Sequence, residues 1–190
     1  SEHVLRDKWV LAISGTHGKT TTASMLAWIL DYAGYNPSFL IGGVVEDFGV
    51  SSRLTDSNFF VIEADEYDTA FFDKRSKFVH YHPKTLVINN LEFDHADIFD
   101  SLKDIQKQFH HLIRTVPNDG LIIRPENNLA IDEVLEQGLW STEQALPAPK
   151  LTTTNYGTEF SVEGNMVDWH LLGEHNMQNG LSAIYAAHHV

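Results

Sequence analysis

The stretch WVLAISGTHGKTTT, residues 9–22, decides the fold class. It opens with an apolar run typical of a buried strand and continues with glycines typical of a tight turn. Gly15 and Gly18 let successive backbone N–H groups point at one anion, and a helix that follows adds its positive N-terminal end. Lys19 supplies a full positive charge, and the Thr20 hydroxyl can bind a Mg²⁺ ion that bridges phosphates. The stretch therefore predicts a strand, a phosphate-binding loop and a helix.

The glycine spacing departs from the general phosphate-loop pattern. Ile13 stands where that pattern places its first glycine, and Gly15 lies closer to Gly18. The strand before the loop and the amphipathic helix after it are the context that favours phosphate binding. The alternative, a turn rich in glycine and threonine that caps an ordinary helix, stays open on these residues alone.

The composition describes an acidic protein of domain size. With 190 residues, 43% of them hydrophobic, the chain can bury the core of one ordinary domain with a small appendage. A net charge of -13 without a long cluster of lysine and arginine argues against a nucleic-acid partner or an anionic membrane surface. The chain lacks cysteine, a signal-peptide pattern and any apolar run of about 18 residues, so we expect a cytoplasmic protein without a membrane span.

Short apolar runs and stretches of helical periodicity follow one another along most of the chain. Three of the runs have the length and β-branched content of strands buried on both faces, at residues 59–62, 86–88 and 121–123. Helical spacing of apolar residues predicts helices over residues 20–33, 101–115 and 129–137. We therefore predict an α/β fold with a mostly parallel sheet and flanking helices, as in phosphate-loop nucleotide-binding proteins.

The texture of the sequence changes after a proline-containing connector at residues 146–150. Residues 151–172 alternate and are rich in threonine, which predicts a small antiparallel β-meander with turns at 155–157 and 164–165. A last helix follows residues 173–176, and one of its faces carries Met177, Leu181, Ile184 and His188.

An acidic cluster follows the predicted strand at residues 59–62. Ligands of open α/β sheets bind beyond the carboxyl ends of the strands, so polar residues at these ends are the first candidates for a site. Glu63 lies closest to the strand, where a carboxylate can hold Mg²⁺ or a water bound to it. For Asp65, Glu66 and Asp68, a solvated acidic turn is an equal alternative.

A second polar cluster, residues 89–97, follows the predicted strand at residues 86–88 and adds a histidine to the acids. His95 can complete the shell of a second divalent ion beside carboxylates, although a surface histidine in an acidic loop explains it as well. The other histidine pairs lack the spacing of a zinc motif, and we interpret them as surface or packing residues: His80 and His82, His110 and His111, His188 and His189.

A third group of polar residues lies at the start of the last helix. Asn176 and Asn179 are spaced to share one helical face, where two amides could read the edge of a base, while His175 could meet the ribose. Asparagine at a helix start is also a common cap, so this group indicates nucleotide binding only together with the two polar clusters described above.

Taken in order, these motifs resemble the central ATP-binding domain of the Mur ligases, over essentially the whole chain. The residues that carry the resemblance are Gly-Thr-His-Gly-Lys-Thr at 15–20, Glu-Ala-Asp-Glu at 63–66, Asp-His at 94–95, and Gly-Glu-His-Asn at 173–176 with Asn179. Residues 67–78 and 92–99 are similar to the murein peptide ligase branch of that family. Members of this branch use ATP to join L-alanyl-γ-D-glutamyl-meso-diaminopimelate, the murein tripeptide, to UDP-N-acetylmuramate in peptidoglycan recycling, through an acyl phosphate.

The resemblance implies roles for individual residues, with ATP and Mg²⁺ as cofactors. The ATP phosphates would meet Gly15, Thr16, His17, Gly18, Lys19, Thr20 and Thr21. The first Mg²⁺ would bind Thr20 and Glu63, His95 would help to place the second, and Lys19, Glu63 and His95 would form the reaction centre. The adenosine would meet His175, Asn176 and Asn179. Several Mur ligases carry a carbamylated lysine after the motif histidine, but this chain has His110 at that spacing and Lys107 as the nearest lysine, so a carbamate is not implied.

The resemblance also implies domains beyond this chain. Mur ligases bind the UDP sugar mainly through an N-terminal domain and close the ligation pocket with a C-terminal one. We therefore expect residues 1–190 to be an excised middle domain that binds Mg-ATP but does not ligate alone. Alternatives are a UDP-N-acetylmuramate–L-alanine ligase and a non-catalytic ATP-binding module. A phosphate-loop GTPase is disfavoured because the Asn-Lys-x-Asp guanine motif is absent and Asn89-Asn90 does not replace it.

Overall fold

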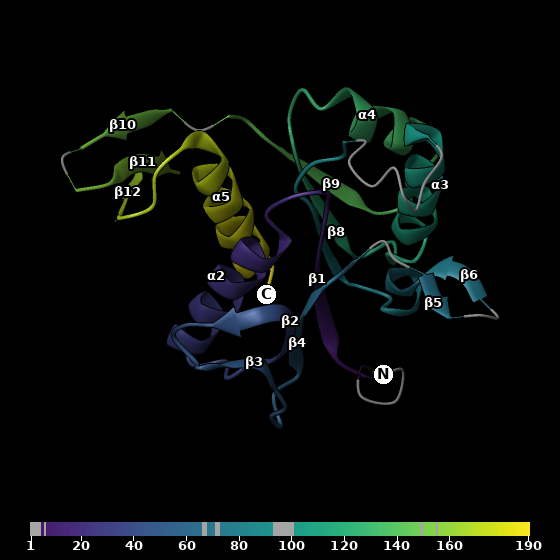
Figure 1. The fold of residues 1–190 in the computed structure, drawn as a ribbon, viewed down its shortest axis with the longest axis horizontal. Coiled ribbons are helices and arrows are strands. Elements are labelled where there is room, and N and C mark those ends of the chain that lie inside the picture. Colours follow the sequence, from purple (N-terminus) through teal and green to yellow (C-terminus); the bar gives the residue numbers. More distant parts are fainter. Residues whose placement is uncertain are drawn as a thin grey trace.

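The computed structural model describes residues 5, 7–65, 68–70, 73–92, 101–148, 150–154 and 156–190, with the backbone alone at 68–70, 73–77 and 151. Within these residues, a seven-stranded sheet has the order β3-β2-β4-β1-β7-β8-β9. Neighbouring strands are parallel except for the antiparallel edge pair β2 and β3 (Figure 1). The strands are β1 (Trp9–Ser14), β2 (Ser38–Val45), β3 (Val50–Arg53), β4 (Phe59–Glu63), β7 (Thr85–Ile88), β8 (Leu121–Pro125) and β9 (Thr142–Leu146).

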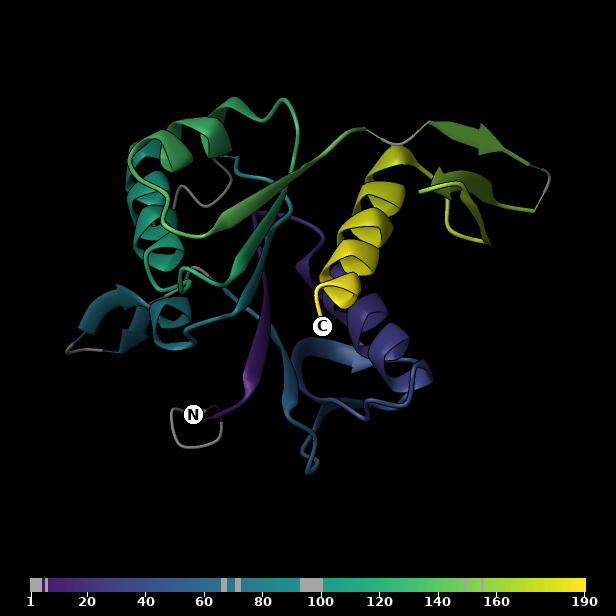
Figure 2. The same ribbon diagram turned by 180° about the vertical axis from the view of Figure 1, so that it is seen from behind.

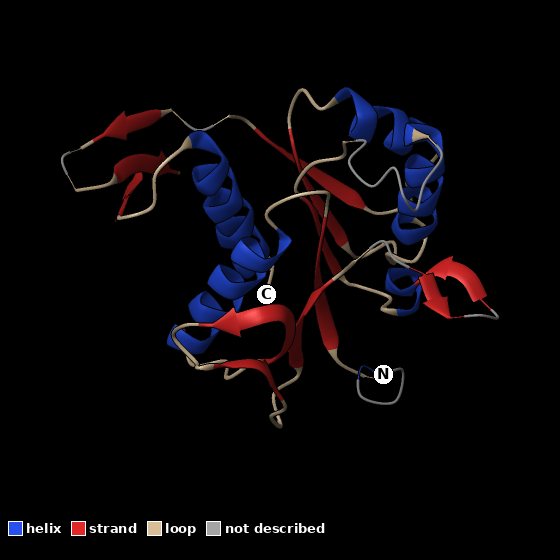
Figure 3. Ribbon diagram, viewed as in Figure 1, coloured by secondary structure: helices blue, strands red, loops and turns tan. Residues whose placement is uncertain are grey.

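Helices cover both faces of this sheet, as Figure 3 shows in blue against the red strands. The helices α2 (Lys19–Tyr32) and α5 (Glu174–His188) lie side by side on one face, and α3 (Leu102–Ile113) and α4 (Leu129–Glu136) lie on the other. Along β1, Leu11 and Ile13 join the core under α2 and α5, while Val10 and Ala12 join the core under α3 and α4. This alternation is why the central strands are apolar on both faces.

Two small antiparallel sheets lie outside the central one. Strands β10 (Leu151–Thr153), β11 (Thr158–Val162) and β12 (Asn165–Trp169) form a three-stranded meander. It extends beyond the N-terminal end of α5, as the view from behind in Figure 2 shows. A short hairpin of β5 (Asp68–Ala70) and β6 (Asp73–Ser76) leads into a 3-10 turn at Lys77–His80.

The structure confirms the predicted α/β fold, and the predicted strands and the first three predicted helices agree to within two residues at each end. The last helix, α5, begins at Glu174, inside the segment predicted to lead into it. The meander is also confirmed, but its second turn lies at Glu163 and Gly164, one residue before the predicted position, because Asn165 already pairs with Val162 as the first residue of β12. Asn155 of the first predicted turn lies outside the described residues. The strands β2, β3 and β9 of the central sheet and the hairpin strands β5 and β6 were not predicted. Among the described residues, no helix has the length and apolar character needed to cross a membrane.

The residue that follows α5, His189, contacts the N-terminal ends of β1 and β7, at the opposite end of these strands from the phosphate loop. His189 Nδ1 is 2.8 Å from the Thr85 hydroxyl, to which the Trp9 indole N–H also donates. The His189 and Trp9 rings meet edge to face with centroids 5.3 Å apart. Burial, and then the positive charge of Lys84, lower the pKa of His189 below its usual 6.5, against an opposing effect of the Asp119 carboxylate.

Candidate functional site

The phosphate loop connects the carboxyl end of β1 to the N-terminus of α2. Gly15 has φ 129° and Gly18 has φ 77°, backbone conformations that favour glycine, and Gly18 caps the helix. The strand β1 lies between β4 and β7, whose ends flank the loop. The loop therefore lies where strands on both sides contribute residues, as expected of a ligand site in an open α/β sheet.

Lys19 is held inside the loop. Its side-chain amine donates a 2.7 Å hydrogen bond to the Gly15 carbonyl and lies 3.5 Å from a carboxylate oxygen of Asp65. Burial, and then the negative charge of Asp65, raise the pKa of Tyr81 above its usual 10.0, so this phenol stays protonated at neutral pH. Asp65, for which a solvated turn was an equal alternative, thus contacts the loop lysine.

Thr20 and Glu63, each predicted to bind the first Mg²⁺, contact one another. The Thr20 hydroxyl lies 2.9 and 3.0 Å from the two carboxylate oxygens of Glu63. The backbone N–H of Gly42, in β2, donates a 2.8 Å hydrogen bond to Glu63 Oε2. Hydroxyl and carboxylate oxygens are the ligands that Mg²⁺ prefers, so the donor set fits this ion.

The segment that follows β7 runs beside the loop on its other flank. The Asn90 side chain accepts a 2.8 Å hydrogen bond from the His17 backbone N–H and donates a 3.2 Å hydrogen bond to the His17 carbonyl. The Thr16 hydroxyl donates to the Glu92 carbonyl at 3.2 Å and accepts from the Glu92 N–H at 2.9 Å. Sequence reasoning gave Asn90 no role, although an amide that follows a buried strand was a signal for one.

The residues predicted on α5 lie in different surroundings. Asn179 is 7% exposed and lies against the loop, because a Cβ atom added to Gly18 would be 2.5 Å from Asn179 Oδ1. Asn176 donates a 2.9 Å hydrogen bond to the Leu172 carbonyl, and the exposed His175 ring folds over Gly173. The structure thus places Asn179 against Gly18 of the loop, whereas Asn176 and His175 lie at the start of α5.

Some predicted site residues lie outside the described part of the chain. These are His95, for the second metal, and its neighbour Asp94, together with Glu66 of the acidic cluster. Among the described residues, no three histidine or acidic side chains gather where they could hold a metal ion. Of the residues predicted to hold a metal, Thr20 and Glu63 are the ones that the structure describes.

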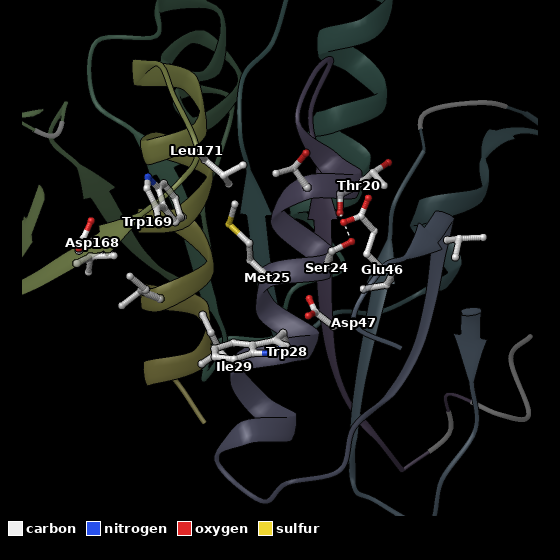
Figure 4. A pocket seen from close by; sticks show the side chains of 16 residues that line it. Thr20, Ser24, Met25, Trp28, Ile29, Glu46, Asp47, Asp168, Trp169 and Leu171 are labelled. Carbon is white, nitrogen blue, oxygen red and sulfur yellow. Dashed lines mark hydrogen bonds between the residues drawn. The ribbon is translucent and has the colours of Figure 1, made fainter. Parts of the chain in front are cut away.

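An apolar groove runs along the outer face of α2, with a volume of about 690 Å³. Its floor includes Met25 and Trp28, one wall carries Glu46 at the end of β2, and the other carries Trp169 and Leu171 (Figure 4). A smaller hollow of about 340 Å³ lies over the phosphate loop. Thr20 and Thr21 line both spaces, so the groove begins at the loop.

Comparison with known proteins gives relatives over the whole chain. Residues 13–187 match the Mur ligase middle domain. The chain is 59% identical, over all of its length, to the UDP-N-acetylmuramate–L-alanyl-gamma-D-glutamyl-meso-2,6-diaminoheptandioate ligase of Escherichia coli (strain K12), and it covers 43% of that protein. It is 32% identical over 97% of its length to the UDP-N-acetylmuramate–L-alanine ligase of Geobacter sp. (strain M21), covering 41% of that protein.

A solved structure gives the same result. The UDP-N-acetylmuramate:L-alanyl-gamma-D-glutamyl-meso-diaminopimelate ligase from Neisseria meningitides matches 99% of this chain with a TM-score of 0.91 and 52% identity, and the chain covers 63% of that structure. The chain therefore spans less than half of the curated relatives and less than two thirds of the solved one. By the family match, the fold and the loop geometry, this chain belongs to the Mur ligase middle-domain family.

Proposed function

We propose that residues 1–190 are the ATP-binding middle domain of a ligase that joins the murein tripeptide to UDP-N-acetylmuramate. The 59% identity to the Escherichia coli ligase over the whole chain carries this proposal, and the preformed phosphate loop agrees with it. The sugar nucleotide and the tripeptide would bind mainly through parts of the protein beyond this chain. ATP and UDP-linked precursors are cytoplasmic metabolites, so the proposed compartment is the cytoplasm.

The phosphates of ATP would bind in the hollow over the loop. The positive end of α2 and the backbone N–H groups at its start favour an anion there. The Lys19 amine, 2.7 Å from the Gly15 carbonyl, is the cation that would turn toward the phosphates. His175, Asn176 and Asn179 in the first turns of α5 are the proposed adenosine contacts, and the groove that begins at Thr21 offers apolar surface for the base.

Mg²⁺ would be held by the Thr20 hydroxyl and the Glu63 carboxylate, which already share a hydrogen bond. When bound, the ion neutralises phosphate charge and orients the transferring group. The Gly42 N–H fixes the carboxylate that would hold it. His95 remains the proposed aid to a second ion, on the basis of the family motif.

In the proposed reaction, a carboxylate oxygen of the muramic acid attacks the γ-phosphate and ADP leaves. The tripeptide amine then attacks the acyl carbon of the acyl phosphate, inorganic phosphate leaves, and the amine releases a proton to solvent. The middle domain holds the phosphates in line and stabilises their charge, which are the main requirements of phosphoryl transfer.

The L-alanine-adding ligase is a second candidate, favoured by the 32% identity to the Geobacter protein over 97% of this chain. Phosphate release by the full-length protein separates the candidates, with ATP, Mg²⁺ and UDP-N-acetylmuramate present and either tripeptide or L-alanine as acceptor. We expect tripeptide-dependent release. Release with L-alanine alone would assign the second candidate, and release with neither acceptor would leave a nucleotide-binding module.

A pair of lysine variants tests the loop in the same assay. Lys19→Ala is expected to abolish release, because it removes the buried cation of the loop. Lys103→Ala removes an exposed lysine of α3 and serves as the matched control, with release expected at the wild-type rate. Release by the Lys19→Ala protein at the wild-type rate would refute the proposed phosphate site.

A further inference from the structure

The carboxamide of Asn90 satisfies both backbone groups of one loop residue. Its oxygen accepts from the His17 N–H at 2.8 Å, and its nitrogen donates to the His17 carbonyl at 3.2 Å. The backbone adds a third bond, from the Thr16 N–H to the Asn90 carbonyl at 3.3 Å. Thr16 and His17, the outer part of the loop, are therefore hydrogen-bonded to the segment after β7, much as one strand is bonded to another.

The neighbouring Asn89 acts on the inner part of the loop. Asn89 is 4% exposed, and its side-chain nitrogen donates to the Thr22 hydroxyl at 2.9 Å and lies 3.4 Å from Asn179 Oδ1. Asn179 in turn fills the space beside Gly18, where an added Cβ atom would lie 2.5 Å away. Asn89, directly after β7, and Asn179, in α5, therefore support the part of the loop that joins α2.

These contacts order the loop in the protein without nucleotide. A loop whose N–H groups converge on one point is unfavourable without an anion, since the aligned dipoles repel and the backbone loses freedom. Contacts that hold this shape in the free protein remove that ordering penalty from the binding step. Because the His17 N–H already donates to Asn90, it is not one of the donors left for the phosphates.

We propose that Asn89 and Asn90 are positioning residues that hold the phosphate loop in its nucleotide-binding shape before the nucleotide arrives. Asn90 fixes the outer part of the loop through His17, and Asn89 fixes the helix end through Thr22 and Asn179. The proposal rests on the proposed binding of ATP. It assigns a role to two amides that the reaction itself does not use.

The test compares Asn90→Ala with Asn128→Ala in the full-length protein. Asn128 caps α4, where its side chain accepts a 3.1 Å hydrogen bond from the Ile131 N–H, so its loss removes a similar bond far from the loop. We expect Asn90→Ala to raise the dissociation constant and the KM for ATP about tenfold, the effect of one to two lost hydrogen bonds. The kcat and the KM for UDP-N-acetylmuramate should stay within about twofold of wild type. Asn128→Ala should lower the melting temperature without changing ATP affinity.

Amide hydrogen exchange without nucleotide gives a second readout that does not depend on the function. Peptides covering residues 14–22 should exchange about tenfold faster in Asn90→Ala and Asn89→Ala than in wild type, and at the wild-type rate in Asn128→Ala. Wild-type ATP affinity in a folded Asn90→Ala protein, or an equal loss in Asn128→Ala, would overturn the proposal. Failure of the wild-type protein to bind ATP would instead refute the proposed function, and with it the nucleotide-positioning role, whatever the exchange rates.

Discussion

Replacing Gly42 by alanine should weaken Mg²⁺ binding without weakening the fold. A Cβ atom at Gly42 would lie 3.1 Å from Glu63 Oε2, tighter than an ordinary contact, so the carboxylate must move by a few tenths of an ångström. That shift stretches the 2.8 Å bond from the Gly42 N–H and turns the carboxylate away from the Thr20 hydroxyl. Losing part of a hydrogen bond to a charged group costs about 1 kcal/mol, which is about fivefold in the Mg²⁺ concentration at half-maximal activity.

The Gly42→Ala protein should be as stable as the wild type or slightly more stable. Gly42 is not in the left-handed region, and alanine reduces the freedom of the unfolded chain, which contributes about 0.4–1 kcal/mol of stability at a compatible site. Gly43→Ala is the matched control, because its added Cβ atom would lie 3.4 Å from the Thr20 methyl group, an ordinary contact. The assay is a Mg²⁺ titration of phosphate release at fixed ATP, with the melting temperature measured alongside. An unchanged Mg²⁺ midpoint in Gly42→Ala, or an equal shift in Gly43→Ala, would refute this reasoning.

Two further predictions concern stability. Leu112→Ala, in the fully buried core under α3, should lower the free energy of unfolding by about 2–5 kcal/mol, whereas Leu129→Ala, 71% exposed, should change it by less than about 0.5 kcal/mol, as denaturant titrations would measure. The lowered pKa of His189 means that the unfolded chain binds more protons than the folded one just below pH 6.5, so stability should fall as the pH is lowered through this range. The pH slope of the melting temperature should flatten in His189→Gln and persist in His188→Gln, which changes an exposed neighbour; an unaltered slope in His189→Gln would count against burial of the imidazole.

The central strands and the helices could be predicted because their signals are local. The strands β1, β4, β7 and β8 are apolar on both faces, and the helices repeat their apolar residues at helical spacing. The strands of the central sheet that were not predicted, β2, β3 and β9, lie toward its edges. The exposed residues of β9 are polar, and β2 contains Gly42 and Gly43, which weaken a strand pattern.

Part of the candidate site could be predicted for the same reason. Glu63 is the last residue of a buried strand, and Thr20 directly follows the loop lysine, so each could be predicted as a Mg²⁺ ligand, and the structure shows them in contact. The pairing of Asn90 with His17 was out of reach, because it depends on β7 being the second neighbour of β1. Strand order depends on how all the strands of the sheet pair, so no single segment of the sequence predicts it. The role of His95 stays a prediction.

The strand order gives the two flanks of the loop different chemistry. The chain passes from β1 to β2, β3 and β4 on one side and then crosses to β7 on the other, so β1 is a point where the direction of strand addition changes. The β4 flank supplies carboxylates, Glu63 next to Thr20 and Asp65 next to Lys19. The β7 flank supplies a neutral amide, Asn90, that contacts the loop backbone, and a carboxylate, Glu92, that lies 3.9 Å from His17 Nε2. The carboxylates of the β4 flank thus contact the loop side chains proposed to bind Mg²⁺ and the phosphates, whereas the amide of the β7 flank holds the loop backbone.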